Sequence, residues 1–257
     1  MLQSVYLPQT RNLLQLPGTN STSLYTDANL TLWINIARGQ VAGEAECIRV
    51  MGTINTVAGQ TPYAFSGVNT GVPTVNGVQG IINIRSLSYN VGSGQLWMTP
   101  RPWPWFSLYN QNNAAPRSGP PKEWAQFGQG AAPGVSGTSQ GAVSGGTFYV
   151  SPVPDQVYTL NCNATCYPIP LVADSDPEAI PYLWTDAVPF FAAYFALMSA
   201  QTNARMADAA QMYKGHYNEF MDRARKQSNP SVNRWIYSQA LDPAQAPKLG
   251  IKGGAGG

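Results

Sequence analysis

Histidine and cysteine are the residue types most often used for catalysis and metal binding, and this sequence contains few of either. Its 257 residues include one histidine, His216, and three cysteines, Cys47, Cys162 and Cys166. A Ser-His-Asp or Cys-His arrangement therefore has a single candidate base, and a histidine-rich metal site cannot form. Because His216 lies within a helical pattern and is flanked by tyrosines, we expect it to have a packing or surface role.

Two other patterns contain the residue types of ligand sites but lack the rest of the motif. Asp174, Asp176 and Glu178 are spaced like part of a calcium loop without its central glycine and distal glutamate. We interpret them as acidic residues before a helix N-terminus, where the helix dipole favours negative charge. The glycine-rich stretch 128–134 lacks the lysine and the following helix of a phosphate-binding loop, so we predict a flexible loop. We expect no catalytic residues, no metal site, no cofactor and no enzymatic activity.

The cysteines are expected to be free thiols. On a strand, Cys162 and Cys166 would lie on one face about 13 Å apart, too far for a disulfide without a bulge. The longest apolar run, 187–200, is shorter than the ~20 residues that span a bilayer, and the N-terminal residues do not form a signal-peptide pattern. We therefore expect folding in a reducing compartment and no transmembrane segment.

Charge is scarce and unevenly distributed. The 28 charged residues are outnumbered by 35 asparagines and glutamines, and the net charge of +2 is too small to attract nucleic acid to the whole surface. Residues 47–122 contain five basic and no acidic residues, 123–222 contain nine acidic and two basic, and 223–257 contain six basic and one acidic. Blocks of opposite charge favour side-by-side self-association, so the composition indicates a binding or assembly protein.

Hydrophobic periodicity predicts a helix followed by strands. A helix over about 27–46 is indicated by a Thr26 or Asp27 cap and an apolar stripe that includes Leu30, Trp33 and Ala37. Strands are predicted at 47–57, 80–90, 95–98, from 147, and from 157 towards 168; the alternation slips near Ser86, which indicates a bulge. The density of proline and glycine over 99–147 predicts no regular element there, with 128–146 as an exposed loop.

The C-terminal third returns to helical spacing. One helix follows Thr185-Asp186, with Pro189 in its first turn, and a second runs over about 204–226, so a break at 201–203 predicts a helical hairpin. The predicted fold class is α+β, with a helical bundle from the N-terminal helix and the C-terminal helical hairpin, an inserted antiparallel β domain and an extended C-terminal arm. The predicted organisation is an extended segment 1–25, a helical domain of 26–46 plus 174–227, a β domain 47–173 with long loops, and an arm 228–257.

Two groups of residues are candidates for contact with partners. The first is an aromatic set that alternates with prolines, which could be a carbohydrate or single-strand stacking platform, or could pack into the core or a subunit interface; we favour the second interpretation. It comprises Trp97, Trp103, Trp105, Phe106 and Tyr109. The second is the basic C-terminal end, which could contact a nucleic-acid backbone, an acidic partner surface or only water. It comprises Arg223, Arg225, Lys226 and Arg234, with Trp235 beside the last.

The order of several passages resembles the head-to-tail adaptor proteins of tailed bacteriophages, of the podoviral tail tubular protein A type. LTLWINIARGQVAGEA (30–45) resembles the opening helix of that family, and GTINTVAGQTPYAF (52–65) with GIINIRSLSYN (80–90) resembles its strand pair. SGPPKEWAQFG (118–128) and the segment 147–172 resemble a Gly-Pro-Pro turn and two strands that end in prolines. The segment from 174 onwards resembles the closing helical pair. The resemblance covers about 25–227 and omits 99–118, 128–146 and the residues after Asn229.

The resemblance implies a structural virion protein in the neck or tail, assembled in the host cytoplasm. Its implied partners are itself, in a ring of twelve subunits, the portal protein, a downstream tail or nozzle protein, and double-stranded DNA that passes through the channel without tight binding. The basic end and Trp235 are then candidates for contact with the portal or a neighbouring subunit, and the aromatic set for contact with the tail or a neighbouring subunit. The alternative is a carbohydrate-binding or receptor-binding module of a virion that uses the aromatic set.

Overall fold

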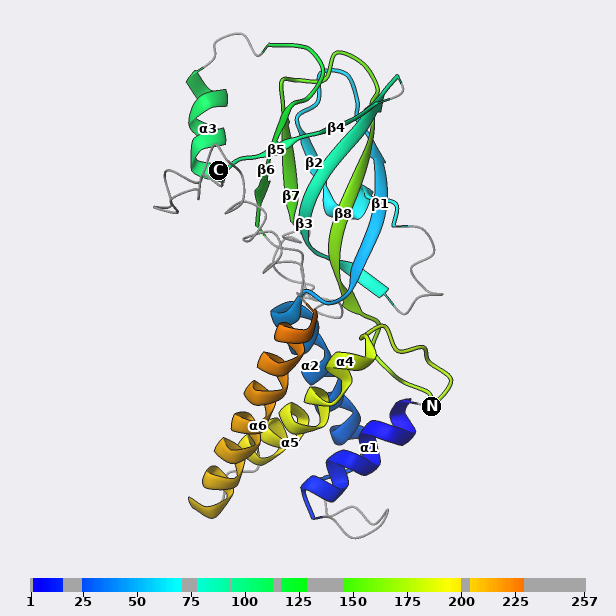
Figure 1. Cartoon of the computed structure of the whole chain (residues 1–257), viewed down its shortest axis with the longest axis vertical. Helices are drawn as coiled ribbons and strands as arrows, with labels where there is room; N and C mark the ends of the chain where they lie inside the picture. Colours follow the sequence, from blue (N-terminus) through cyan, green and yellow to red (C-terminus); the bar gives the residue numbers. More distant parts are fainter. Residues whose placement is uncertain are drawn as a thin grey trace, which may run out of the picture.

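The molecule has a sheet-rich end and a helical end. The computed structural model describes residues 2–15, 25–70, 78–92, 94–112, 117–128, 146–199 and 204–228. It contains two β-sheets and several α-helices, which confirms the mixed α+β class. Both sheets and helix α3 lie at one end, and the other labelled helices lie at the opposite end (Figure 1). One continuous hydrophobic core includes side chains from both ends.

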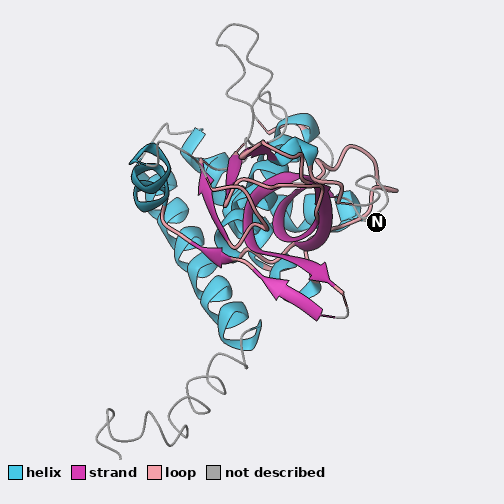
Figure 2. Cartoon of the chain, turned by 90° about the horizontal axis from the view of Figure 1, so that it is seen from above, coloured by secondary structure: helices cyan, strands magenta, loops and turns pink. Residues whose placement is uncertain are grey.

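The first sheet is antiparallel and is built around the strand that returns to the helices. Its order is β1 (Arg49–Asn55), β8 (Thr159–Pro168), β3 (Val78–Val91) and β4 (Gly94–Trp97). The pairing of β3 with β8 shifts register at three places, one of them between Ile84 and Ser86, which confirms the predicted bulge. Figure 2 shows strongly curved strands when the molecule is seen along its long axis, and bulges are expected to increase the curvature of a sheet.

The second sheet contains shorter strands and one parallel pair. Its order is β2 (Pro62–Ala64), β7 (Thr147–Ser151), β6 (Glu123–Phe127) and β5 (Thr99–Pro100), and a short 3-10 helix, η1 (Phe65–Gly67), follows β2. β7 is antiparallel to both of its neighbours, whereas β5 runs parallel to β6. Among the named strands that the structure describes, the pairing is therefore antiparallel, as predicted, apart from β5 with β6.

The prediction that 99–147 contains no regular element is wrong. This stretch contains β5, β6 and the helix α3 (Trp103–Asn112). The prolines begin α3 instead of preventing it, because Pro102 precedes the helix and Pro104 lies in its first turn, where backbone N–H groups have no helical partner. The N–H of Phe106 donates to the Pro102 carbonyl at 3.1 Å. β6 forms because it pairs with β7 and buries Trp124.

The N-terminal segment is helical over Leu2–Leu13 (α1), so the prediction of an extended segment over 1–25 is wrong for these residues. Tyr6 and Thr10, one turn apart, are 1% and 0% exposed, and α1 packs against α2 and α5. The packing of this face outweighs Pro8, which lies inside the helix and has no N–H to donate. Tertiary contacts therefore decide the structure of a segment whose local sequence favours no helix.

Three of the remaining described helices lie close to their predicted ranges, and a fourth, short helix was not predicted. α2 (Asp27–Ala45) begins as expected, because the side chain of Thr26 caps it by accepting the Asn29 N–H at 3.2 Å. A short helix, α4 (Tyr182–Thr185), precedes α5 (Ala187–Ser199), in which Pro189 lies in the first turn. α6 (Ala204–Ser228) packs along α5, and α2 packs on α5 as well. Most of the predicted loop 128–146 and the arm after 228 lie outside the described residues.

Candidate interaction surfaces

A buried ion pair joins the N-terminal helices to the segment that returns from the sheets. The side chain of Arg38, on α2, is 1% exposed, and its Nη2 lies 2.7 Å from Oε1 of Glu178, whose side chain is 8% exposed. Arg38 Nη1 also donates to the Ile169 carbonyl at 2.7 Å. Sequence analysis missed this pair, although a signal was available. Arg38 lies on the apolar stripe of its helix, and a charge on a buried stripe requires a partner.

The acidic residues 174–178 do not act as a group at a helix N-terminus, so that interpretation is wrong for two of them. Glu178 pairs with Arg38 and accepts the Ile180 N–H at 2.9 Å. The carboxylate of Asp176 accepts the N–H groups of Val172 and Ala173 at 2.6 and 2.7 Å, and these hydrogen bonds lower the pKa of Asp176. Asp176 therefore stabilises a turn, and Glu178 stabilises a buried contact, at the junction between the two ends of the molecule.

Glu46 connects the end of α2 to the first sheet. It forms the C-cap of α2 with φ of 46°, in the left-handed region that non-glycine residues rarely adopt. Its carboxylate accepts a hydrogen bond from Asn83 Nδ2 at 2.8 Å and forms an ion pair with Arg85, both on β3. These contacts fix the direction in which the chain leaves the helix, so the helical end holds a defined orientation relative to β3.

The predicted aromatic set does not form one exposed platform. Phe106 is 1% exposed, and the ring centroid of Trp103 lies 4.6 Å from that of Tyr149. These two residues therefore pack α3 against the second sheet. Trp97 and Trp105 are 63% and 40% exposed, and the Arg101 guanidinium lies 4.6 Å from the Trp105 ring centroid. The side chain of the fifth member, Tyr109 on α3, lies outside the described part of the structure.

The basic end of α6 is exposed but already contacts acidic groups. Arg223 lies 3.1 Å from Glu219, and Arg225 lies 3.7 Å from a carboxylate oxygen of Glu44 on α2. Lys226 is exposed. Arg234 and Trp235, the other members of this predicted group, lie outside the described residues. The described part of the group therefore anchors α6 to α2 and also presents positive charge to solvent.

The histidine and the cysteines occupy positions that need no catalytic explanation. The His216 side chain is 47% exposed, and its ring centroid lies 5.6 Å from that of Phe190. The three cysteines are free, and burial raises the pKa of Cys162 to about 12 and of Cys166 to about 11. Within the described ranges, no three His, Cys, Asp or Glu side chains group to hold a metal, and no helix is both long and apolar enough to cross a membrane.

The comparison with protein families covers most of the chain. The family model described as SU10 adaptor protein matches residues 9–238. The chain belongs to the SU10 adaptor protein family. The match begins within α1, includes both sheets and all later helices, and continues ten residues beyond the end of α6, so that it contains Arg234 and Trp235. A comparison with curated protein sequences finds no match.

Membership of the SU10 adaptor family confirms the resemblance to phage head-to-tail adaptors. The protein is a phage structural adaptor and a virion component. The match also includes 99–118 and 128–146, for which the resemblance found in the sequence gave no support. The surfaces of the protein are therefore the features from which an adaptor role must be explained.

Proposed function

We propose that this SU10 adaptor family member forms a ring that joins the portal to the tail and continues the DNA channel. The observation that carries the proposal is the family match over residues 9–238. We further propose twelve subunits in the ring, assembly in the host cytoplasm, and a place in the neck of the virion. The partners are then neighbouring copies, the portal protein and a downstream tail or nozzle protein.

In this proposal, the two ends of the subunit face different components of the virion. Residues 26–46 and 174–227 form a helical domain, in which α5 and α6 are a hairpin packed on α2, and 47–173 form the β domain inserted between them. Contacts among α2, α5 and α6 support the first unit, and the two sheets support the second. The helical domain faces the portal side, and the β domain faces the tail or the outside of the ring.

Exposed apolar side chains at both ends support lateral and axial contacts. In a ring, each copy presents two different surfaces to its neighbours, so apolar groups that face solvent in one copy become buried. At the helical end, the large exposed apolar side chains include Leu32, Ile36, Val172, Tyr182 and Met212. At the sheet end, they include Leu96, Trp97, Trp105, Leu108 and Phe127.

The DNA channel requires weak contact with the duplex. Each added Lys–phosphate or Arg–phosphate contact strengthens a salt-dependent interaction that would impede movement of the DNA. The net charge of +2 agrees with a channel that does not hold DNA tightly. Intrahelical and interhelical pairs of Arg223 and Arg225 reduce the available positive charge further.

The basic group at the C-terminal end attaches the ring to the portal or to a neighbouring subunit. Arg223, Arg225 and Lys226 lie at the end of α6, and Arg234 and Trp235 follow in the arm 228–257. Truncation at Asn229 is expected to leave a folded chain, because the described residues up to 228 form a hydrophobic core among themselves. The same truncation should abolish co-sedimentation with portal-bearing capsids. Deletion of only residues 253–257 is the control, and unchanged attachment of the long truncation would contradict this assignment.

The alternative function, a carbohydrate-binding or receptor-binding module, depends on the exposed Trp97 and Trp105. A stacking platform needs several exposed rings in one plane, whereas Trp103 and Phe106 pack inwards. A glycan array separates the two proposals. Binding of the intact protein that is lost in Trp105→Ala would favour the module, and absence of glycan binding together with ring formation would favour the adaptor.

A further inference from the structure

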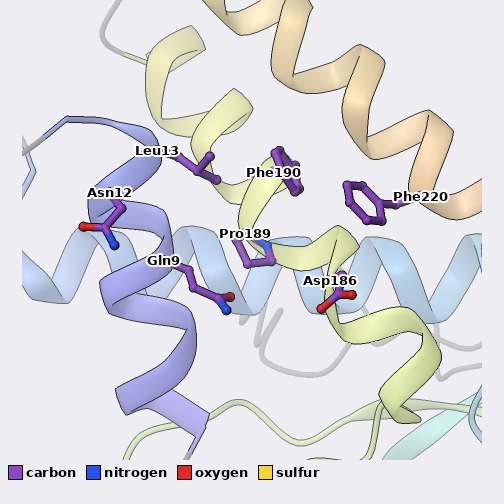
Figure 3. A pocket seen from close by; sticks show the side chains of 7 residues that line it. All are labelled: Gln9, Asn12, Leu13, Asp186, Pro189, Phe190 and Phe220. Carbon is purple, nitrogen blue, oxygen red and sulfur yellow. The ribbon is translucent and has the colours of Figure 1, made fainter.

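A groove of about 400 Å³ lies between α1, α5 and α6. Figure 3 shows side chains from the three helices converging on it. The lining residues are Gln9, Asn12, Leu13, Asp186, Pro189, Phe190 and Phe220. Its volume is at the lower end of the range for ligand pockets, so it suits a few side chains of a peptide segment and is too small for a whole helix.

The chemistry of the groove is apolar with one negative charge. The rings of Phe190 and Phe220 stack with centroids 5.1 Å apart, and Leu13 and Pro189 extend this apolar surface. Asp186 is exposed and is the only acidic residue in the lining. Arg223 lies over the Phe220 ring at 5.2 Å, but its charge is paired with Glu219 at 3.1 Å. The groove therefore suits an aromatic side chain next to a cation.

Residues 229–257 of the chain contain this combination. Arg234 is followed directly by Trp235, Ile236 and Tyr237, and the segment carries three basic residues against one acidic residue. Arg234 can pair with Asp186 while Trp235 packs on the phenylalanine rings, an arrangement in which both the charge and the apolar area are complementary. The match to the SU10 adaptor family continues to residue 238, so these four residues belong to the matched part of the chain.

The position of the groove on α6 favours residues 229–257 of another copy, rather than those of the same copy, as its occupant. Phe220 lies eight residues before the end of α6, which is about 12 Å back along the helix. Asn229 precedes Pro230, and the residue before a proline favours extended backbone. A segment that returned to its own groove would have to reverse direction within 229–233. A neighbouring copy can offer its groove without that reversal, as repeated head-to-tail contacts in a ring require.

We infer that the groove lined by Leu13, Asp186, Phe190 and Phe220 receives Arg234 and Trp235 of a second copy. This inference rests on the proposed ring and adds a specific contact to it. Each subunit then inserts its arm into the groove of one neighbour and accepts the arm of the other neighbour. Every groove is therefore filled only when the ring is closed. The arm then contributes to the ring itself.

Cysteine cross-linking between full-length chains tests the inference. Asp186→Cys and Arg234→Cys are made in separate chains, mixed with a portal complex, oxidised and analysed on a non-reducing gel, and the same sample is viewed by electron microscopy. We expect a cross-linked heterodimer that reducing agent separates. Gln95→Cys, at an exposed position on β4 at the other end of the molecule, replaces Asp186→Cys in the control and should give no such product.

The gel and the images separate failure of this inference from failure of the proposed function. Rings without the heterodimer would overturn the inference and leave the proposed ring standing, and absence of both would overturn both. A chain that carries both cysteines and cross-links only within itself would also overturn the inference. As a second measurement, Asp186→Arg and Arg234→Asp should each weaken self-association at least threefold, and the two changes combined in one chain should restore it. Failure of the combined variant to recover would contradict the charge pairing.

Discussion

Arg38 connects three segments of the chain from within the core. Its guanidinium contacts Glu178, the Ile169 carbonyl and Asn35 Oδ1, and it is 1% exposed. Arg38→Met would leave the Glu178 carboxylate buried without its partner, which is expected to cost about 3–5 kcal/mol of unfolding free energy. Urea denaturation followed by circular dichroism measures the loss.

Two further variants test whether the unpaired buried carboxylate explains this loss of stability. Arg38→Met combined with Glu178→Met should recover most of the loss, because an apolar pair needs no charge compensation. Arg85→Met is the matched control, since Arg85 pairs with Glu46 at the surface and its side chain is 40% exposed, so the cost should stay below about 1 kcal/mol. Equal costs for Arg38→Met and Arg85→Met would contradict the buried-pair account.

At the scale of single elements, replacing glycine with alanine should have opposite effects on stability at two positions. A Cβ at Gly52 on β1 would lie 2.7 Å from Val68 Cγ1 and 3.0 Å from the Asn69 carbonyl oxygen, so Gly52→Ala should destabilise by about 1–3 kcal/mol. A Cβ at Gly39 inside α2 would meet nothing within 4 Å, so Gly39→Ala should stabilise by about 0.5–1 kcal/mol. Thermal unfolding measures both, and a shift of the same sign in both variants would contradict this description of the packing.

Elements with a strong local period could be predicted from the sequence, and elements decided by distant contacts could not. α2, α5, α6, β3 and β8 have clear apolar periodicity and were placed correctly. α1 was missed because its helix depends on burial of Tyr6 and Thr10 against other helices. α3 was missed because proline density was interpreted without regard to position, although Pro102 and Pro104 stand where a helix tolerates them.

The candidate surfaces could likewise be predicted from the sequence only where they do not depend on distant contacts. The aromatic set was recognisable from its composition. The division of its α3 members into packed Trp103 and Phe106 and exposed Trp105 depends on which residues of β6 and β7 approach that helix. The groove between α1, α5 and α6 could not be predicted, since α1 itself was not. Arg38 was recognisable as a buried charge, but its partner lies 140 residues away in the chain.

At the scale of the whole molecule, the exposed Trp97 is a test of the tail-facing end. Its side chain is 63% exposed, so Trp97→Ala should change the unfolding free energy by less than about 0.5 kcal/mol and yet reduce attachment of the next tail component. Trp103→Ala is the contrasting variant. Its half-buried ring packs against Tyr149 and Phe127, and its loss should destabilise the fold by about 1–3 kcal/mol. Co-sedimentation and urea denaturation separate the two effects, and normal tail attachment by Trp97→Ala would exclude this residue from the interface.

We propose that many copies of this SU10 adaptor family member assemble as a ring on the portal. The large apolar side chains exposed at both ends, and the groove between α1, α5 and α6, are surfaces that such an assembly would cover. Electron microscopy of the full-length protein mixed with a purified portal complex tests the claim most directly. We expect a closed ring of twelve copies bound coaxially at one end of the portal. Portal particles without added density, beside a protein that remains monomeric, would contradict it.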